Sequence, residues 1–408
     1  MTKYTVIDAM PGAGKTSWLI EQLNDPANDK KYIYITPYLD EITRLRESVT
    51  ERELKEPNRN NNEGRKLRSL KMLVEDGEDI ASTHSLLQTA DYELIQLLRQ
   101  HRYTLVVDEA MTVIEDVNID KYDIERLVSN KDIEINDTDG KVTWNGTETK
   151  RFKDIQMLAK AGTLYYSRNS MMVKIFSDEV LKTFTEVIAM TYLFEYSYMS
   201  VWYELNGVSF DMKSIKYNSE LNQYELIEYD KYAENRQALY KLINIYEGKY
   251  NEDLSKLNLS SSGYRRILDE GRTGVKKLDL ISRTTRNFLD KFKEDGAPVF
   301  WTTFKEYKEK KYLAPRGYSN SFISLNTRAT NIYADSQCIA YLISRHPRPM
   351  QTGYFTDKGL TFNNSGWSLS DLLQLIYRSR VRKGEPIQLF LPSKDMRDLL
   401  DMWASYEL

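Results

Sequence analysis

A glycine-rich loop near the beginning of the chain constrains its fold more than any other feature. Residues 9–16 read AMPGAGKT, and they follow a run of β-forming residues at 4–7 and precede an amphipathic segment. Gly12 and Gly14 allow the backbone to turn its N–H groups toward an anion, and a helix beginning near Lys15 would add the positive end of its dipole. The sequence therefore predicts the strand, phosphate-binding loop and helix of an α/β nucleotide-binding fold. The alternative is a chance glycine turn between a strand and a helix.

Each residue of this loop has an expected role. Lys15 is expected to reach the β- and γ-phosphates of a nucleoside triphosphate, and the Thr16 hydroxyl is expected to hold Mg²⁺. The other nucleotide contacts are expected from the backbone of Pro11, Gly12, Ala13 and Gly14. ATP and Mg²⁺ are therefore the predicted cofactors.

Composition places the chain among ordinary globular proteins. Apolar residues make up 41% of the sequence and charged residues 29%, and a length of 408 residues predicts two domains of about 200 residues each. No apolar run approaches the roughly 20 residues that span a bilayer, and a strand begins almost at once, which leaves no room for a signal peptide. We therefore expect a cytoplasmic protein with no membrane partner. Cys338 is the only cysteine and the three histidines lie far apart, which disfavours disulfides and metal-ligand clusters.

Charge excludes indiscriminate binding to nucleic acid. The chain has 57 basic and 60 acidic residues, for a net charge of −3, so any contact with phosphates must use local basic patches. Four candidate patches lie at residues 44–46, 65–71, 265–277 and 378–383. A solvated helix face is the plainer interpretation of each.

The first half of the sequence alternates predicted strands and helices, which is typical of a mostly parallel sheet covered on both faces. A strand at 103–107 delivers Asp108 and Glu109 at its carboxyl end. An acidic pair is what a phosphate-binding loop needs opposite it, because Asp108 can hold the Mg²⁺ shell while Glu109 polarises the attacking water. The alternative is an acidic helix cap, and the apolar strand before Asp108 argues against it. The other expected elements are a strand at 31–36, helices at 39–49 and 91–100, and a mobile polar excursion at 51–64.

Two lobes are predicted, each with an insertion. The first covers residues 1–200, with an insertion at about 118–182 that contains a hairpin at 133–144 and a helix at 152–161, after which a strand ends at Thr191. The second covers residues 201–408, with a helix-rich insertion at about 231–295. Its expected strands are at 201–204, 224–229, 298–303, 322–325 and 387–391, and its last helix is at 370–378.

Six segments resemble the motifs of superfamily 2 helicases in their order along the chain. They are AMPGAGKT, the strand ending at Thr36 and Pro37, STHS at 82–85, DEAM at 108–111, AMT at 189–191 and QLIYRSRVR at 374–382. The C-terminal portion, from FWTTFKEYKEK at residue 300, resembles compact helicase-like proteins encoded by bacteriophages. This resemblance implies an α/β fold with two tandem RecA-like lobes and parallel sheets, ATP between the lobes, and single-stranded nucleic acid across their outer faces.

The resemblance also implies roles for single residues. Thr191 is expected to couple hydrolysis to movement, and Gln374 is expected to contact the nucleotide. The last motif departs from the family because Tyr377 stands where a glycine is usual, so the arginine that reaches the γ-phosphate is expected to be Arg378 or Arg382, and Arg380 stays open as a third candidate. The expected nucleic-acid contacts are loop residues at strand ends, each of which could equally be a turn or a helix cap: Pro37, Thr83, His84, Thr303 and Asn326.

The predicted function is that of an ATP-dependent helicase or translocase that moves along single-stranded or forked nucleic acid, with DNA favoured over RNA. Phage replication or recombination proteins are the expected partners, the host cytoplasm the expected location, and a monomer the expected state. One alternative is a packaging-type ATPase that translocates duplex, although no carboxylate cluster typical of an attached nuclease follows Pro298. The other is a non-motor P-loop protein such as a nucleotide kinase, which would not need an arginine-rich helix or this length.

Overall fold

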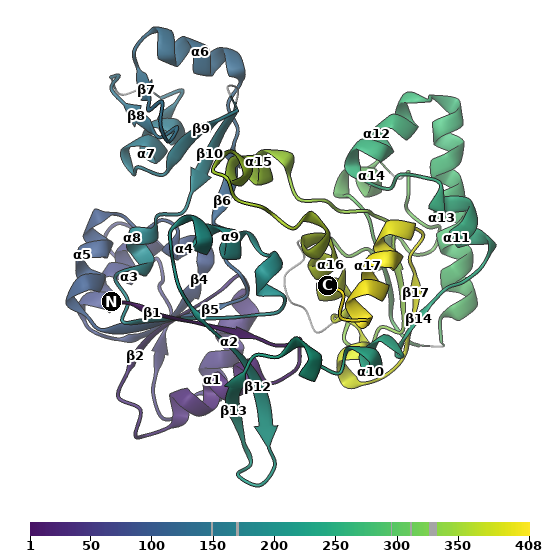
Figure 1. The fold of residues 1–408 in the computed structure, drawn as a ribbon, viewed down its shortest axis with the longest axis horizontal. Coiled ribbons are helices and arrows are strands. Elements are labelled where there is room, and N and C mark those ends of the chain that lie inside the picture. Colours follow the sequence, from purple (N-terminus) through teal and green to yellow (C-terminus); the bar gives the residue numbers. More distant parts are fainter. Residues whose placement is uncertain (148–149, 169–170, 295, 311, 326–332) are drawn as a thin grey trace. The chain divides into compact units, whose positions relative to one another are not determined.

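The computed structural model describes residues 1–147, 150–168, 171–294, 296–310, 312–325 and 333–408. They form two compact units, shown in Figure 1. The first unit comprises Met1–Ala9, Ala13–Tyr229 and Arg348–Phe362, and the second comprises Met10–Gly12, Asp230–Pro347 and Asn363–Leu408. Both units are built from strands and helices around a sheet, so the predicted α/β class is confirmed.

An eight-stranded sheet organises the first unit. Its strands pair in parallel except for the antiparallel hairpin at one edge. The inner strands are buried along nearly their whole length, as expected for parallel strands covered on both faces. In spatial order the strands are β13 (Gln223–Glu228), β12 (Asp211–Asn218), β1 (Lys3–Asp8), β11 (Glu186–Thr191), β5 (Tyr103–Asp108), β2 (Lys31–Thr36), β4 (Asp79–Thr83) and β3 (Leu54–Lys55).

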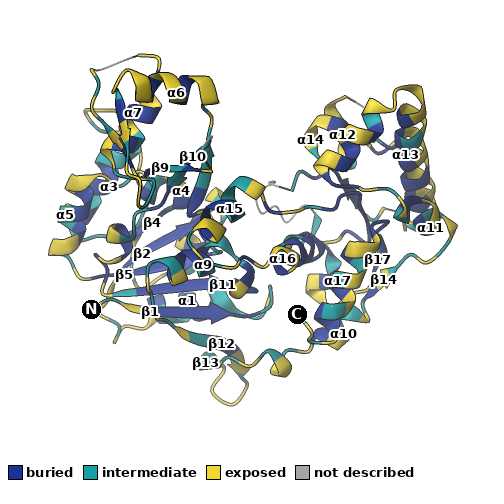
Figure 2. Ribbon diagram, turned by 45° about the horizontal axis from the view of Figure 1, so that its top comes forward, coloured by how far each residue is buried: buried dark blue, intermediate teal, exposed yellow. Residues whose placement is uncertain are grey.

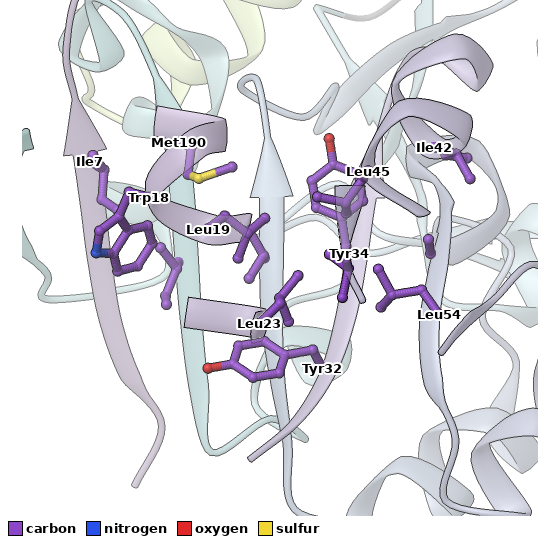
Figure 3. Close-up of a cluster of buried hydrophobic side chains, with 14 of the residues drawn as sticks. Ile7, Trp18, Leu19, Leu23, Tyr32, Tyr34, Ile42, Leu45, Leu54 and Met190 are labelled. Carbon is purple, nitrogen blue, oxygen red and sulfur yellow. The ribbon is translucent and has the colours of Figure 1, made fainter. Parts of the chain in front are cut away.

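Helix α1 (Lys15–Asn24) packs on this sheet and holds the loop before it in place. Trp18, Leu19 and Leu23 of α1 lie in one buried cluster with Ile7 of β1 and Met190 of β11, as Figure 3 shows. This packing fixes the helix start relative to the ends of the strands. The other helices of the sheet layer are α2 (Leu39–Ser48), α3 (Lys66–Glu75), α4 (His84–Leu87), α5 (Tyr92–Gln100), α8 (Asp178–Leu181) and α9 (Tyr198–Leu205).

A small subdomain lies between β5 and β11 of the first unit, in the region where an insertion at about 118–182 was expected. Three antiparallel strands form its sheet in the order β6 (Ile114–Val117), β10 (Met171–Ile175) and β9 (Leu164–Ser167). The predicted hairpin and helix are confirmed, and the whole subdomain has its own buried cluster. These elements are β7 (Ile133–Ile135), β8 (Val142–Trp144), α6 (Lys121–Ser129) and α7 (Lys153–Lys160).

Helix α15 (Pro349–Asp357) comes from much later in the chain and packs on this subdomain. Arg348 forms an ion pair with Asp116 of β6 at 2.6 Å, and Arg168 Nε lies 3.3 Å from the Asp357 carboxylate. The rings of Tyr165 and Tyr354 meet edge to face at 5.9 Å between centroids. The segment Arg348–Phe362 therefore belongs to the first unit, although in the sequence it lies between two segments of the second unit.

A four-stranded parallel sheet organises the second unit. Its order is β14 (Ile243–Ile245), β17 (Ile387–Phe390), β16 (Cys338–Tyr341) and β15 (Val299–Thr302). Figure 2 shows that the long helix α13 (Arg272–Phe292) buries one face and exposes the other.

No helix within the described residues is both long and apolar enough to cross a membrane. The remaining helices are α10 (Arg236–Tyr240), α11 (Lys249–Ser255), α12 (Ser261–Asp269), α14 (Lys305–Glu309), α16 (Asn364–Ile376) and α17 (Lys394–Ala404).

Residues 201–229 differ from the prediction. The expected strand at 201–204 is part of helix α9, whose start is capped by the Ser197 hydroxyl accepting from the Ser200 N–H at 3.1 Å. Val201, Trp202 and Tyr203 are all buried, and this packing overrides their β propensity. The hairpin β12–β13 pairs with β1, so the first unit extends to Tyr229, whereas the sequence placed a boundary near residue 200.

Three further expectations need correction. Residues 51–64 are not only a surface excursion, because Leu54 is 2% exposed and pairs with Asp79 of β4. The segment at 231–295 is not purely an insertion, since β14 within it is an edge strand of the second sheet. The expected strand at 322–325 is reduced to a single bridge between Phe322 and Trp301. These structures depend on pairing with segments distant in the sequence, and local sequence patterns do not indicate such pairing.

Candidate triphosphate site

Five parallel strands of the first unit end at one edge of the sheet, and the predicted site residues of that unit lie at this edge. Asp8 of β1 is level with Thr191 of β11, and Met190 is level with Asp108 of β5. Thr36 of β2 is level with Thr83 of β4. Because the carboxyl ends of parallel strands form the usual ligand site of open α/β sheets, this edge is the candidate triphosphate site.

The glycine-rich loop has the backbone geometry that its sequence predicts. Gly12 has φ 87° and Gly14 has φ 107°, both in the left-handed region that favours glycine. Gly14 precedes α1, and no side chain caps that helix start within the described residues. The Lys15 ammonium donates a hydrogen bond to the Ala9 carbonyl at 2.5 Å across the loop. The loop therefore presents a helix N-terminus and a lysine to the sheet edge, which suits an anion.

Asp108 lies buried at the end of β5, with its carboxylate held by β2. Its Oδ2 accepts from the Tyr34 hydroxyl at 2.7 Å and from the Thr36 hydroxyl at 3.4 Å. Burial, and next the charge of Glu109, raise the pKa of Asp108 to about 7, while the charge of Lys15 lowers that pKa. A nearby cation would stabilise the ionised form of this carboxyl group.

These residues fit a magnesium ion bound together with phosphates. Mg²⁺ prefers oxygen ligands and is commonly held by one or two carboxylates plus substrate phosphates. Asp108 and the Thr16 hydroxyl supply such oxygens, and the part of the chain that the structure describes holds no cluster of three or more His, Cys, Asp or Glu side chains suited to a metal. An Mg²⁺ ion held by these two side chains would need phosphate oxygens and water to complete its ligand shell.

Glu109 has a strained backbone and a neighbour on β11. Its φ of 64° lies in the left-handed region, which costs a non-glycine residue about 1–3 kcal/mol and is concentrated at functional sites. Its N–H donates to the Met190 carbonyl at 2.9 Å, and its Oε2 accepts from the Thr191 hydroxyl at 3.3 Å. The acidic pair after β5 and the threonine at the end of β11 are thus directly connected.

The expected nucleic-acid residues of the first unit differ in exposure. Pro37 and Thr83 are partly exposed at the sheet edge, and the Thr83 hydroxyl lies 3.1 Å from the Ser85 hydroxyl. His84 is 8% exposed at the start of α4. Burial lowers the pKa of His84 to about 4, so the ring is neutral at physiological pH. These observations favour a packing role for His84 over a direct phosphate contact.

The predicted residues of the second unit lie in varied surroundings. Gln374 is exposed near the end of α16, whereas Thr303 is 2% exposed after β15. Arg380 pairs with Glu294 at 3.1 Å. Arg378 is partly buried, and Arg382 is exposed in the 3₁₀ turn Arg380–Lys383. Asn326 lies outside the described residues.

The sequence predicted no contact with Asp108 for two residues of the site, although Thr36 ends one of the helicase-like segments. Tyr34 and Thr36 both bond to Asp108, and they alternate on β2, the strand beside β5. Side chains two positions apart point to the same face of a strand. The polar residues in the otherwise apolar run at 31–36 could have indicated a role in the site. The sequence alone, however, does not show which strand lies beside this one.

Comparison with known proteins places the chain in a family. Residues 237–404 match the sequence model of the YonV C-terminal Rossmann-like domain, and residues 114–174 match that of the YonV middle domain. Over 420 residues the chain is 31% identical to the SPbeta prophage-derived uncharacterized protein YonV of Bacillus subtilis (strain 168), with 99% of each protein covered. The chain belongs to the YonV family. The YonV middle domain corresponds to the small subdomain from β6 to β10, and the prophage origin of the relative agrees with the resemblance to bacteriophage proteins.

Two solved helicase structures are distantly similar to this YonV family member. The DUF1998 helicase MrfA bound to DNA and AMPPNP has 12% identity and a TM-score of 0.35, with 100% of this chain and 48% of that chain covered. The Mycobacterium smegmatis helicase Lhr bound to ssDNA and AMP-PNP has 12% identity and a TM-score of 0.37, with 98% and 46% covered. The chain therefore spans about half the length of either helicase.

Proposed function

We propose that this protein is a nucleoside triphosphatase whose hydrolysis of ATP drives movement along single-stranded nucleic acid, with DNA favoured. The observation that carries the proposal is the convergence of Lys15, the Asp108–Glu109 pair and Thr191 at one edge of a parallel sheet. A phosphate-binding loop opposite an acidic pair is the arrangement that phosphoryl transfer to water requires.

The residues of the first unit have distinct proposed roles. Lys15 and the backbone of the loop bind and orient the β- and γ-phosphates. Thr16 and Asp108 would hold Mg²⁺, which supplies positive charge against the phosphoryl oxygens. Glu109 orients the attacking water and accepts its proton. Thr191, bonded to Glu109, transmits the state of the hydrolytic site to the end of β11.

The motor activity rests on the order of the helicase-like motifs, in which an arginine of the second unit completes the site. Arg382 is our first candidate for that arginine, because Arg380 is already held by Glu294, and Arg378 is the second. Gln374 is proposed as a further nucleotide contact. The loops at Pro37 and Thr83, which follow strands and are partly exposed, are proposed to contact phosphates, which would make binding independent of sequence. Tandem RecA-like lobes and a role in phage replication or recombination are part of the same proposal.

Stimulation of ATP hydrolysis by nucleic acid is the first test. Phosphate release should rise strongly when single-stranded DNA is added, and less when duplex DNA is added. A rate raised only by duplex would favour the packaging-type ATPase, and phosphate transfer from labelled ATP to a nucleoside would favour the kinase. A rate unaffected by any nucleic acid would contradict the motor.

The Glu109→Gln variant tests the hydrolytic assignment. The amide cannot accept a proton from water, so kcat should fall by about 10²-fold, while affinity for ATP stays near that of the wild type because the loop is unchanged. Steady-state phosphate release and equilibrium nucleotide binding measure the two effects. The matched control is Glu115→Gln, which removes the same charge from a residue that pairs with Lys174 on β10. Full turnover in Glu109→Gln would remove Glu109 from the mechanism.

A further inference from the structure

The hairpin β12–β13 reaches past the end of the strand that precedes the phosphate-binding loop. Ile7 of β1 is level with Lys213 of β12, so Ser214 is level with Asp8, the last residue of β1. Strand β12 continues to Asn218, which at about 3.3 Å per residue is about 13 Å further. The tip of the hairpin therefore stands beyond the carboxyl edge of the sheet, on the side of β1 away from Asp108.

Tyr224 at the start of β13 lies directly on the loop. A side chain at Gly14 would place its Cβ 2.0 Å from Tyr224 Cε1, so the ring occupies the space that only a glycine leaves open. The Tyr224 N–H donates to the Glu21 carboxylate of α1 at 2.8 Å, which fixes the hairpin to the helix. Ala13 of the loop packs on the same buried cluster as Tyr224.

A second aromatic ring extends this surface outward. The ring centroids of Tyr217 and Tyr224 are 5.1 Å apart with an interplanar angle of 58°, and Tyr217 is 46% exposed. Tyr224 itself is only partly buried. Two tilted aromatic rings therefore stand beside the loop, one in contact with it and one open to solvent.

We propose that Tyr224 stacks on the base of the nucleotide whose phosphates the loop binds, with Tyr217 at the outer side of the base. This inference rests on the proposed triphosphate site and adds the part that binds the base. A triphosphate held by the loop must direct its base away from Asp108 and Glu109, where the reacting phosphate lies, and the hairpin flanks the loop on that opposite side. Stacking uses the π face that every base has, so this site should accept purine nucleoside triphosphates with little selectivity between ATP and GTP.

The test compares ligands with and without a base in variants of Tyr224. Tyr224→Leu keeps an apolar contact with the loop but removes the π face, and it should weaken binding of AMP-PNP and GMP-PNP by about tenfold. Binding of inorganic tripolyphosphate, which has no base, should stay unchanged. Tyr224→Trp should bind both nucleotides at least as well as the wild type. Calorimetric titration of the full-length protein with each ligand gives the affinities.

The possible results separate this inference from the proposed function. Equal weakening of nucleotide and tripolyphosphate in Tyr224→Leu would mean that the ring only supports the loop, and unchanged affinity for all ligands would also overturn the inference. Failure of the wild type to bind any of these ligands would instead overturn the triphosphate site itself. The control is Tyr232→Ala, which removes a tyrosine that is 68% exposed after the hairpin and should change none of these affinities.

Discussion

Replacing Lys15 with alanine should lower kcat for ATP hydrolysis by about 10³-fold while leaving the fold intact. The ammonium group sits at the first residue of α1, beside the Ala9 carbonyl, where it would neutralise charge on the β- and γ-phosphates. Loss of one preorganised donor costs about 10²–10³ in kcat, and the loss of a full positive charge places the expected effect at the upper end. Steady-state phosphate release measures this fall.

The fold should survive because Lys15 is only partly buried and carries no part of the apolar core. Thermal unfolding followed by circular dichroism should therefore give the same midpoint as the wild type. Lys30→Ala is the matched control, since Lys30 lies on the same unit and its side chain is 54% exposed in an ion pair with Glu186. Hydrolysis that persists in Lys15→Ala would remove the central assignment of the loop.

Replacing Arg382 with alanine should lower kcat by about 10³-fold or more, because an arginine that stabilises the transferring phosphoryl group contributes about 10³–10⁵ to the rate. Affinity for ATP should change much less, since the guanidinium acts on charge that develops in the transition state. Single-turnover hydrolysis together with equilibrium binding of AMP-PNP would separate these two effects.

The adjacent residue provides the control for this experiment. Lys383→Ala removes the same charge from the same turn, but Lys383 is paired with Asp335, so its loss should leave hydrolysis near the wild-type rate. Arg378→Ala tests the other candidate. If the alanine variants of Arg378, Arg380 and Arg382 all hydrolyse ATP at full rate with single-stranded DNA present, no arginine of the helicase-like motif takes part in the reaction and the motor proposal loses its main support.

Elements with strong local signals could be predicted from the sequence. The strand, loop and helix from Lys3 to Asn24 were predicted because their apolar pattern and glycine spacing are local properties. Strand β5 with its acidic pair, the hairpin β7–β8 and strand β17 were found for the same reason. In the candidate site, this was enough to place the loop and the carboxylates at one sheet edge, because parallel strands share the direction of their ends.

Features that depend on distant partners could not be predicted. Nothing local shows that β12 pairs with β1, or that Tyr224 contacts Gly14. The short apolar run of β16 is equally compatible with a buried helix turn, and periodicity alone does not distinguish the two. The hydrogen bond from the Tyr34 hydroxyl to Asp108 depends on the pairing of β2 with β5, which the sequence does not show.

The return of Arg348–Phe362 to the first unit determines how this protein can be dissected. A fragment that stops at Tyr229 loses the helix that covers the small subdomain, which would leave Asp116 without its ion pair and the Tyr165 ring without its aromatic partner. The matched C-terminal region, expressed alone, would carry that helix without the small subdomain on which it packs. Experiments that seek the activity of either half therefore need a chimera in which residues 348–362 are rejoined by a linker to the N-terminal portion.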